Sequence, residues 1–290
     1  MNWYVFGLLV MMAFCMGASD GGRGLLVRRM NRVETPIAVL YAGFAVPGGL
    51  ILLWFQGIPQ IQNGFWSALT VSAVLHIPIT LLLYYGMKKT DLSLFGGIIA
   101  LAPISVLFGE WIINGDAPNT LGLYGVGVAV VGTYLLKIDK FKEGPFEPFR
   151  KLFIDPGTKL GLLMLCCFAV AVPFQRRAIR LSSPPLVLLI EMGLVATCMS
   201  VVALIVDRNW RREIHNNARL LLKTGFCWIL GVICMYEALR FTLGSYVHTL
   251  RTLSVFVLLF VAAKALKEDW RRMLPGLLII VFGVSMVALS

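Results

Sequence analysis

The chain has 290 residues, of which 58% are hydrophobic and only 14% are charged, and its formal net charge is +11. Soluble domains typically carry about 25% charged residues. This composition therefore excludes an ordinary soluble enzyme, a disordered tail and a disulfide-rich secreted module. A polytopic membrane protein remains. Its basic residues lie mostly in short connections between apolar runs, where anionic lipid headgroups, and not nucleic acid, are the expected contacts.

Ten apolar segments follow one another along the chain, and each is long enough to cross about 30 Å of hydrocarbon as a helix. They are predicted at Trp3–Arg28, Thr35–Phe55, Phe65–Met87, Leu92–Asn114, Leu121–Ile138, Thr158–Leu181, Pro185–Val206, Ala218–Phe241, Ser245–Leu266 and Met273–Leu289. Helices are required because lipid satisfies no backbone N–H or C=O group. The sequence therefore predicts an all-α membrane protein with ten transmembrane helices.

The two halves of the chain resemble each other at matched positions. The matched pairs are Tyr84 with Tyr236, Lys88 with Arg240, Gly125 with Gly276, Gly132 with Gly283, and Pro36 with Pro185. The predicted organisation is one five-helix repeat over residues 1–140, a linker over 141–157 and a second five-helix repeat over 158–290. An odd number of spans in each half inverts the second copy, which places a substrate site near the midplane between the halves.

Lys and Arg residues are distributed unevenly over the predicted connections. The connections after the first, third, fifth, seventh and ninth segments share one side of the membrane and, with the adjoining helix ends, hold 20 of the 26 Lys and Arg residues. The connections on the other side hold 4. Cytoplasmic loops carry an excess of Lys and Arg. The sequence therefore predicts a cytoplasmic location for the basic side and an external location for both termini.

Several motifs of the first half recur in the second half. In the first half they are Ala102–Phe108, Gly109-Glu110 and the stretch from Leu121-Gly122 to Gly132. In the second half they are Leu253–Val257, Lys267-Glu268, Gly276 and Gly283. This double pattern resembles the fourth-to-fifth helix signature of EamA-type transporters, which belong to the drug/metabolite transporter superfamily. Lys267 departs from the pattern, because the family usually has glycine before this acidic residue.

The resemblance covers the whole chain, and it implies ten helices in two inverted five-helix repeats. It also implies a central cavity lined mainly by helices 1, 3, 4, 6, 8 and 9. Activities in the family include export of amino acids and other metabolites, nucleotide-sugar exchange and movement of lipid-linked groups. Characterised relatives usually have both termini in the cytoplasm, which is opposite to the orientation that the charge count predicts here.

Ionisable side chains inside the apolar segments are the candidates for substrate binding, because each costs about 2.5–3.5 kcal/mol at the bilayer centre and usually faces a cavity. The predicted substrate-binding residues are Arg251, His248, Glu237, His76, Asp20 and Arg23. Arg251 cannot lose its charge and needs an anion, which is Glu237, a substrate carboxylate or a phosphate. Glu237 has an alternative partner in Arg240. His76 is either a substrate ligand or proton carrier, or a neutral residue bonded to a neighbouring helix.

Asp20 and Arg23 are three residues apart and share a helix face. Glycines surround this pair, and Pro173 lies at a similar depth in the sixth segment. Both features predict weakened or broken helices at the midplane, although the pair is also compatible with a helix end at the membrane interface or with a helix-packing site built from small residues.

Three arginines at one end of the sixth segment, Arg176, Arg177 and Arg180, are interpreted either as side chains that snorkel to headgroups or as a vestibule that attracts phosphate. Glu191 is expected to make a structural contact. Glu110 and Glu268 are expected to be interfacial residues at helix ends, in structural or gating roles and not as ligands.

These features predict a membrane transporter that moves a small polar, anionic metabolite by alternating access without ATP, since no nucleotide-binding loop is present. A flippase for phosphorylated lipids is the alternative. An intramembrane enzyme is less favoured, because zinc, serine-nucleophile and paired-aspartate motifs are missing. A non-transporting structural subunit is also less favoured. No cofactor or metal is expected. Membrane lipids are expected partners, a homodimer is a further option, and the predicted location is the bacterial cytoplasmic (inner) membrane.

Overall fold

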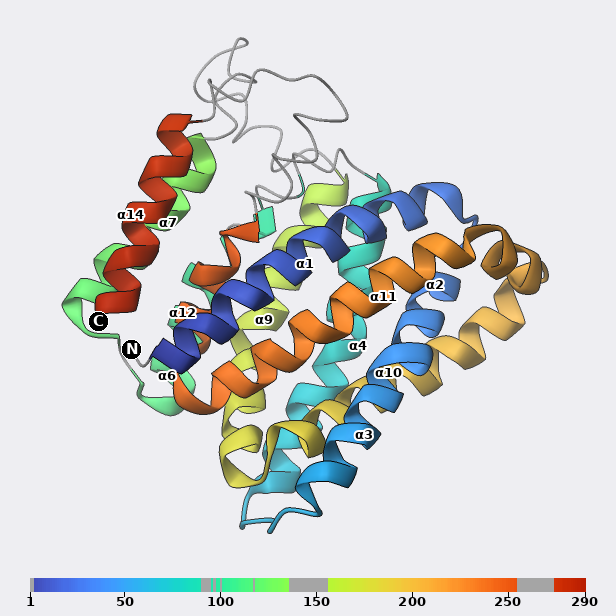
Figure 1. Ribbon diagram of the computed structural model, residues 1–290, viewed down its shortest axis with the longest axis horizontal. Helices are drawn as coiled ribbons and strands as arrows, with labels where there is room; N and C mark the ends of the chain where they lie inside the picture. The colour runs from blue at the N-terminus through green and yellow to red at the C-terminus, as the bar shows by residue number, and fades with distance from the viewer. Residues whose placement is uncertain are drawn as a thin grey trace.

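The computed structural model describes residues 3–89, 95, 98–99, 101–116, 118–135, 156–254 and 274–290, and these residues form helices joined by short connections (Figure 1). In chain order the helices are α1 (Trp3–Arg29), α2 (Glu34–Leu40), the π-helical turn η1 (Tyr41–Ala45), α3 (Val46–Gln56), α4 (Phe65–Lys89), α6 (Ala102–Asn114), α7 (Thr120–Leu135), α9 (Pro156–Leu181), α10 (Pro184–Val206), α11 (Trp210–Phe241), α12 (Gly244–Arg251) and α14 (Leu274–Leu289).

Six of the described helical segments are long and apolar enough to cross a membrane. They are α1, the continuous span formed by α2, η1 and α3, and then α4, α9, α10 and α11. With that span taken as one helix, the described residues hold ten helices, so the all-α prediction is confirmed. Among these six spans, α11 differs most from its predicted boundaries. It begins at Trp210 and not at the predicted Ala218, because its first turns are basic and extend beyond the apolar stretch.

The shorter helices correspond to parts of the remaining predicted segments. Helix α6 covers the second half of the predicted segment Leu92–Asn114, and α12 covers the beginning of Ser245–Leu266. Most of the predicted linker over residues 141–157, and the Lys267-Glu268 motif, lie outside the described residues.

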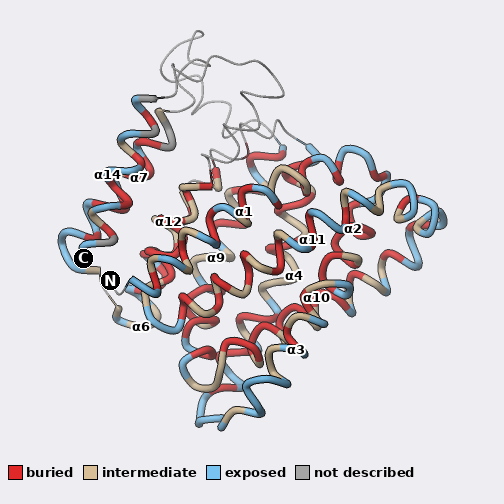
Figure 2. The backbone as a smooth tube through the Cα atoms, in the orientation of Figure 1, coloured by how far each residue is buried: buried red, intermediate tan, exposed pale blue. Residues whose placement is uncertain are grey.

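Four long helices form the centre of the molecule as two packed pairs. Helix α1 packs along α11, and α4 packs along α9. Helix α10 packs against α2, η1 and α3, while α7 and α14 pack against each other at one side (Figure 1). Buried residues gather on the inward faces of the central helices (Figure 2). Each pairing joins a helix before the predicted linker to a helix after it.

Glycines bring the backbones of α7 and α14 close together. A Cβ atom at Gly125 would lie 2.7 Å from the carbonyl oxygen of Gly283, and one at Gly132 would lie 3.0 Å from that of Gly276. These are the glycines that the sequence matches between the halves. Gly125 corresponds to Gly276, and Gly283 corresponds to Gly132. The contact between Gly125 and Gly283 is therefore equivalent to the contact between Gly276 and Gly132, and the interface is symmetric with respect to the two halves.

Helices α6 and α9 also run side by side at close range. The Ser105 hydroxyl donates to the backbone carbonyl of Leu165 at 2.5 Å. One turn further on, a Cβ atom at Gly109 would collide with the backbone carbonyl of Ala169. Because the obstacle is backbone and not a mobile side chain, the interface requires glycine at position 109.

We expect Gly109→Ala to destabilise the protein by about 1–3 kcal/mol, because an added methyl group in a packed interface forces the helices apart. Thermal unfolding of the purified protein in detergent measures the change. The matched control is Gly193→Ala in α10, where a Cβ atom meets no atom within 4 Å and alanine favours the helix. Equal stability of the two variants would contradict the close α6–α9 contact.

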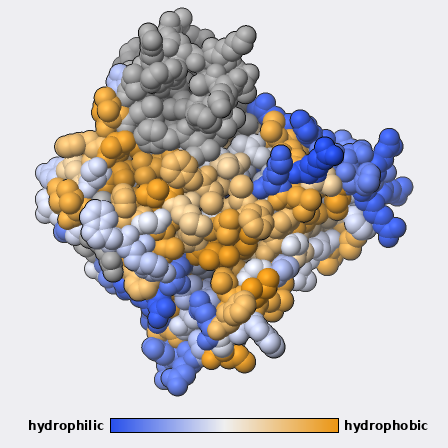
Figure 3. Space-filling model, viewed as in Figure 1, coloured by the Kyte–Doolittle hydropathy of each residue, from blue (hydrophilic) through white to orange (hydrophobic). Residues whose placement is uncertain are grey.

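The two ends of the helical bundle differ in charge. One end carries ten exposed basic residues, and Figure 3 shows hydrophilic surface there, at the right of the view, beside a hydrophobic band. They are Arg28, Arg29, Arg32, Lys88, Lys89, Arg208, Arg211, Arg212, Arg219 and Lys223. Three acidic residues at the same end are buried, and each accepts a hydrogen bond that offsets the cost of burial. Glu34 accepts from Tyr85, Asp207 accepts from Thr35, and Glu213 accepts from the backbone N–H of Asn31.

Both described termini lie at the opposite end. The ring of Tyr4 contacts that of Phe241 at the end of α11, and the Asn119 side chain donates to the carbonyl oxygen of Ser290. Exposed basic residues therefore gather at one end of the bundle, and both described termini lie at the other end. The predicted orientation is based on the same separation of Lys and Arg residues from the termini.

Candidate functional site

A cavity lies between the central helices, lined by side chains from α1, η1, α4, α9, α10, α11 and α12. Four of the six predicted substrate-binding residues line it, namely Arg23, His76, His248 and Arg251. The other lining residues are Met16, Tyr41, Ile79, Thr80, Leu83, Phe168, Ala171, Val172, Gln175, Met192, Trp228, Val232 and Met235. The cavity therefore draws on helices from both halves of the chain.

Asp20 joins the two arginines of the cavity. One carboxylate oxygen accepts from the Arg23 guanidinium, and the other accepts from Arg251 Nη2 at 3.3 Å. Arg23 is 3% exposed, Asp20 16% and Arg251 13%. The anion that Arg251 requires is thus supplied by Asp20 from α1, and not by Glu237. Two guanidinium groups share one carboxylate, so this cluster carries one net positive charge.

The helices around this cluster are continuous. Helix α1 runs unbroken from Trp3 to Arg29 through its glycines, and α9 runs unbroken through Pro173. The predicted break at the midplane, and the predicted alternative of a helix end at Asp20, are therefore both wrong. Glycine has a low helix propensity, but α1 packs closely against α11, and the Thr224 side chain lies where a Cβ atom at Gly22 would be. This tertiary packing stabilises the helical backbone of α1.

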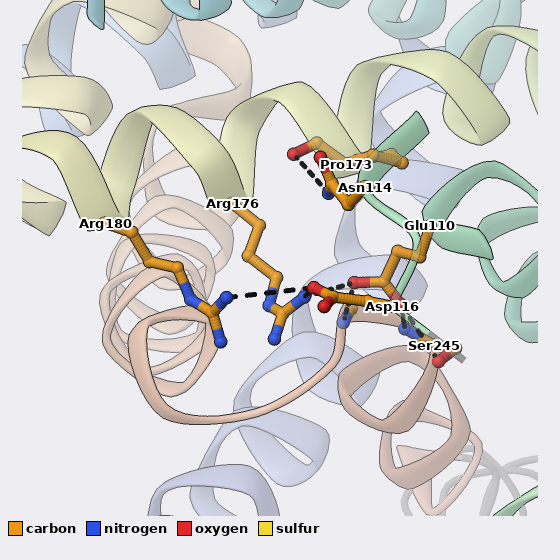
Figure 4. A network of polar contacts seen from close by, with 8 residues as sticks. Glu110, Asn114, Asp116, Pro173, Arg176, Arg180 and Ser245 are labelled. Carbon is orange, nitrogen blue, oxygen red and sulfur yellow. Dashed lines mark hydrogen bonds and ion pairs between the residues drawn. The ribbon is translucent and has the colours of Figure 1, made fainter. Parts of the chain in front are cut away.

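Glu110 fixes the position of α12, the helix that carries His248 and Arg251, and Figure 4 shows Glu110 beside Ser245 near the start of that helix. Its carboxylate accepts from the backbone N–H of Gly244 at 2.7 Å and from that of Ser245 at 3.1 Å. It also accepts from the Ser245 hydroxyl at 3.1 Å. A carboxylate at a helix N-terminus satisfies N–H groups that have no partner within the helix. Glu110 is 1% exposed and lies one turn before the end of α6, so these contacts agree with the structural role at a helix end that the sequence suggested.

The three arginines of α9 have different surroundings (Figure 4). Arg176 is buried and forms ion pairs with Glu110 at 3.4 Å and with Asp116 at 2.5 Å. Arg180 is about half exposed and lies 3.7 Å from Asp116. Arg177 is exposed. Arg176 therefore belongs to the contact between α6, α9 and α12, which leaves Arg177 and Arg180 as the surface members of the predicted vestibule.

Glu237 and the two histidines complete the predicted set. Glu237 lies 3.9 Å from Arg240 near the end of α11 and does not line the described cavity. The buried ring of His248 packs on Phe168 with a centroid separation of 5.4 Å. His76 is half-buried in α4 and faces the cavity.

Glu191 makes the structural contact that the sequence predicts. It is fully buried and accepts hydrogen bonds from Ser72, from Gln175 at 2.8 Å and from Tyr236 at 2.5 Å. These donors lie on α4, α9 and α11. Glu191 thus ties α10 to three neighbours, and it holds Gln175 at the edge of the cavity.

Several cavity residues were not identified from the sequence, among them Tyr41, Thr80, Phe168, Gln175 and Trp228. Tyr41 and Thr80 share a hydrogen bond of 2.9 Å between their hydroxyl groups. Polar residues within apolar segments were the available signal for Tyr41, Thr80 and Gln175. Phe168 and Trp228 carried no such signal, because aromatic residues are common throughout these segments.

Comparison with known proteins identifies the class. Residues 5–138 match the EamA-like transporter family. This part of the chain is an EamA-like transporter domain of the drug/metabolite transporter superfamily, so the resemblance inferred from the sequence is confirmed there. The family consists of transporters and not enzymes, and membership implies secondary transport of small metabolites. Together with the long apolar helices, the match makes the chain a multi-pass integral membrane protein.

No curated protein matches the chain in sequence. Among solved structures, 29 chains match. One of them, described as "Crystal structure of protein", aligns over 98% of this chain and 95% of its own length, with a TM-score of 0.59 and 14% sequence identity. At this level of identity the likeness is one of fold alone, and it extends over both halves of the chain.

Proposed function

We propose that the protein moves a small anionic metabolite across the membrane by alternating access, without ATP, and that the substrate binds in the cavity between Arg23 and Arg251. The single observation that carries the proposal is the buried cluster in which two arginines share one carboxylate. Its net positive charge would be offset by one anionic group of a substrate. Buried charges usually require such a partner.

The proposed architecture is ten transmembrane helices in two inverted repeats, with the boundaries predicted from the sequence. Two observations support it. Helix α1 packs on α11 as α9 packs on α4, which are equivalent pairings when the halves are exchanged. The matched glycines of α7 and α14 also meet in equivalent pairs. An inverted repeat favours alternating access around a fixed central site.

Transport of a soluble anion is favoured over flipping of a phosphorylated lipid. The flippase alternative drew on three arginines of α9 as a phosphate-attracting entrance. Arg176, the innermost of them, is already engaged by Glu110 and Asp116. The arginines that remain for a ligand at membrane depth are those of the central cavity.

Uptake into liposomes that contain the purified protein tests this proposal. Labelled carboxylates, sugar phosphates and amino acids would be supplied with a concentration gradient and no ATP. We expect uptake of at least one anion, with a loss of about 30-fold in Arg251→Ala, since truncation of one member of a buried charge pair costs about 2 kcal/mol or more.

Arg219→Ala is the matched control, because it removes an arginine that is exposed on α11 and lies outside both the cavity and the predicted vestibule, and we expect it to transport normally. The proposal would be overturned by protein that moves no anion of the panel, or by Arg251→Ala protein that transports as well as the unmodified chain.

A further inference from the structure

The lining of the cavity specifies more than the charge of its ligand. Besides the arginines, its polar residues are Tyr41, His76, Thr80, Gln175 and His248. Several of these already use their hydrogen bonds within the protein. The hydroxyl of Thr80 donates to the carbonyl of His76 at 2.8 Å and contacts the hydroxyl of Tyr41. The amide of Gln175 donates to Glu191. Few neutral polar groups are therefore left for a ligand.

The arginines provide donors that are not yet used. Arg23 is 3% exposed, and its Nε has no hydrogen-bond partner among the described residues. Arg251 directs one Nη atom to Asp20, and a guanidinium has five N–H donors. A planar carboxylate matches such donors well. Because Asp20 neutralises one of the two cations, the cluster balances one negative charge and not two.

The rest of the lining is apolar. Ten of the 17 lining residues are aliphatic or aromatic or are methionines, and they include Trp228, Met192, Met235, Ile79 and Leu83. Such a wall stabilises an apolar group by removing it from water. It disfavours a sugar or another hydroxyl-rich group, whose buried hydroxyls would lack partners.

We propose that the substrate is an amphipathic monoanion, with a carboxylate that binds between Arg23 and Arg251 and an apolar aryl or branched alkyl body that lies against Trp228 and the methionines. This inference rests on the proposed function and narrows its substrate class. A phosphomonoester carries up to two negative charges, and a sugar phosphate adds several hydroxyl groups, so neither matches both parts of the cavity.

Calorimetric titration of the purified full-length protein in detergent tests the substrate class without requiring transport. The three probes are phenylacetate, its neutral analogue phenylacetamide, and glycerol 3-phosphate. We expect phenylacetate to bind about tenfold or more tightly than either of the others, because charge-assisted hydrogen bonds are about twice as strong as neutral ones. Arg251→Ala should abolish the preference over phenylacetamide, while Arg219→Ala should retain it.

A second variant guards against misfolding of Arg251→Ala. Met235→Gln leaves both arginines in place and adds a polar group to the apolar wall, so it should weaken phenylacetate about threefold or more. The substrate class is overturned if glycerol 3-phosphate or phenylacetamide binds as tightly as phenylacetate, or if phenylacetate does not bind. Transport of a sugar phosphate would leave the proposed transport function intact and overturn only the inferred substrate class. The expected binding pattern without any transport would overturn only the proposed transport function.

Discussion

Replacement of Glu110 by alanine is expected to lower the free energy of unfolding by about 3–5 kcal/mol, because it leaves several buried hydrogen-bond donors without an acceptor, at about 1–3 kcal/mol each. Arg176, which is 3% exposed, loses one of its two carboxylate partners and keeps Asp116. The same substitution removes the acceptor for the first N–H groups of α12. Urea or thermal unfolding in detergent micelles measures the effect.

Glu237→Ala is the control for this prediction, because it breaks an ion pair of 3.9 Å whose arginine is 55% exposed. Exposed pairs contribute about 0–1 kcal/mol. A double-mutant cycle with Arg176→Met adds a second test, since the two losses should overlap if the residues act together. Similar stability of Glu110→Ala and Glu237→Ala would contradict the role assigned to Glu110.

Replacement of Asp20 by alanine is expected to destabilise the protein by about 3–5 kcal/mol for a related reason. Asp20 is the carboxylate that contacts both Arg23 and Arg251, and its loss leaves both cations without a carboxylate partner among the described residues, at membrane depth. The vacated space lies beside two guanidinium groups. A small carboxylate such as formate should therefore enter it and restore part of the thermal stability, because a ligand that binds only the folded state stabilises it.

Sodium chloride at the same ionic strength is the control for this rescue, and it should stabilise Asp20→Ala less than sodium formate does. If Asp20→Ala is as stable as the unmodified chain, the arginines do not depend on Asp20. If formate has no greater effect than chloride, the cluster does not recognise carboxylates.

Hydropathy located the helices well, because the bilayer imposes apolar runs of about 20 residues. Helix α4 was predicted to begin at Phe65 and does so, and α9 ends at Leu181 as predicted. The start of α11 was missed, since eight residues from Trp210 onward are helical without being apolar. Hydropathy detects the part of a helix that lies in lipid and not the part that extends into water.

The composition of the cavity was only partly predictable. Arg251 was identified because a permanent charge in an apolar segment needs a partner, but its partner Asp20 lies 231 residues away. Sequence alone cannot decide between Asp20 and Glu237, since that choice depends on which helices adjoin. The burial of Glu110 was not predicted for the same reason: it lies one turn before the end of α6, where only the arrival of α12 buries it.

The central claim is that one cavity between the two halves is reached alternately from both sides of the membrane. Substituted-cysteine labelling tests it without knowledge of the substrate. In a chain whose six free cysteines are replaced, Met235→Cys would place a thiol on the cavity wall. Val74→Cys, on a side of α4 that is 53% exposed and that we assign to lipid, serves as the control.

A membrane-impermeant thiol reagent would be added to right-side-out and to inside-out vesicles. Alternating access predicts that Met235→Cys is labelled from both sides and that Val74→Cys is labelled from neither. Labelling of Met235→Cys from one side only, or from neither side, would contradict the account.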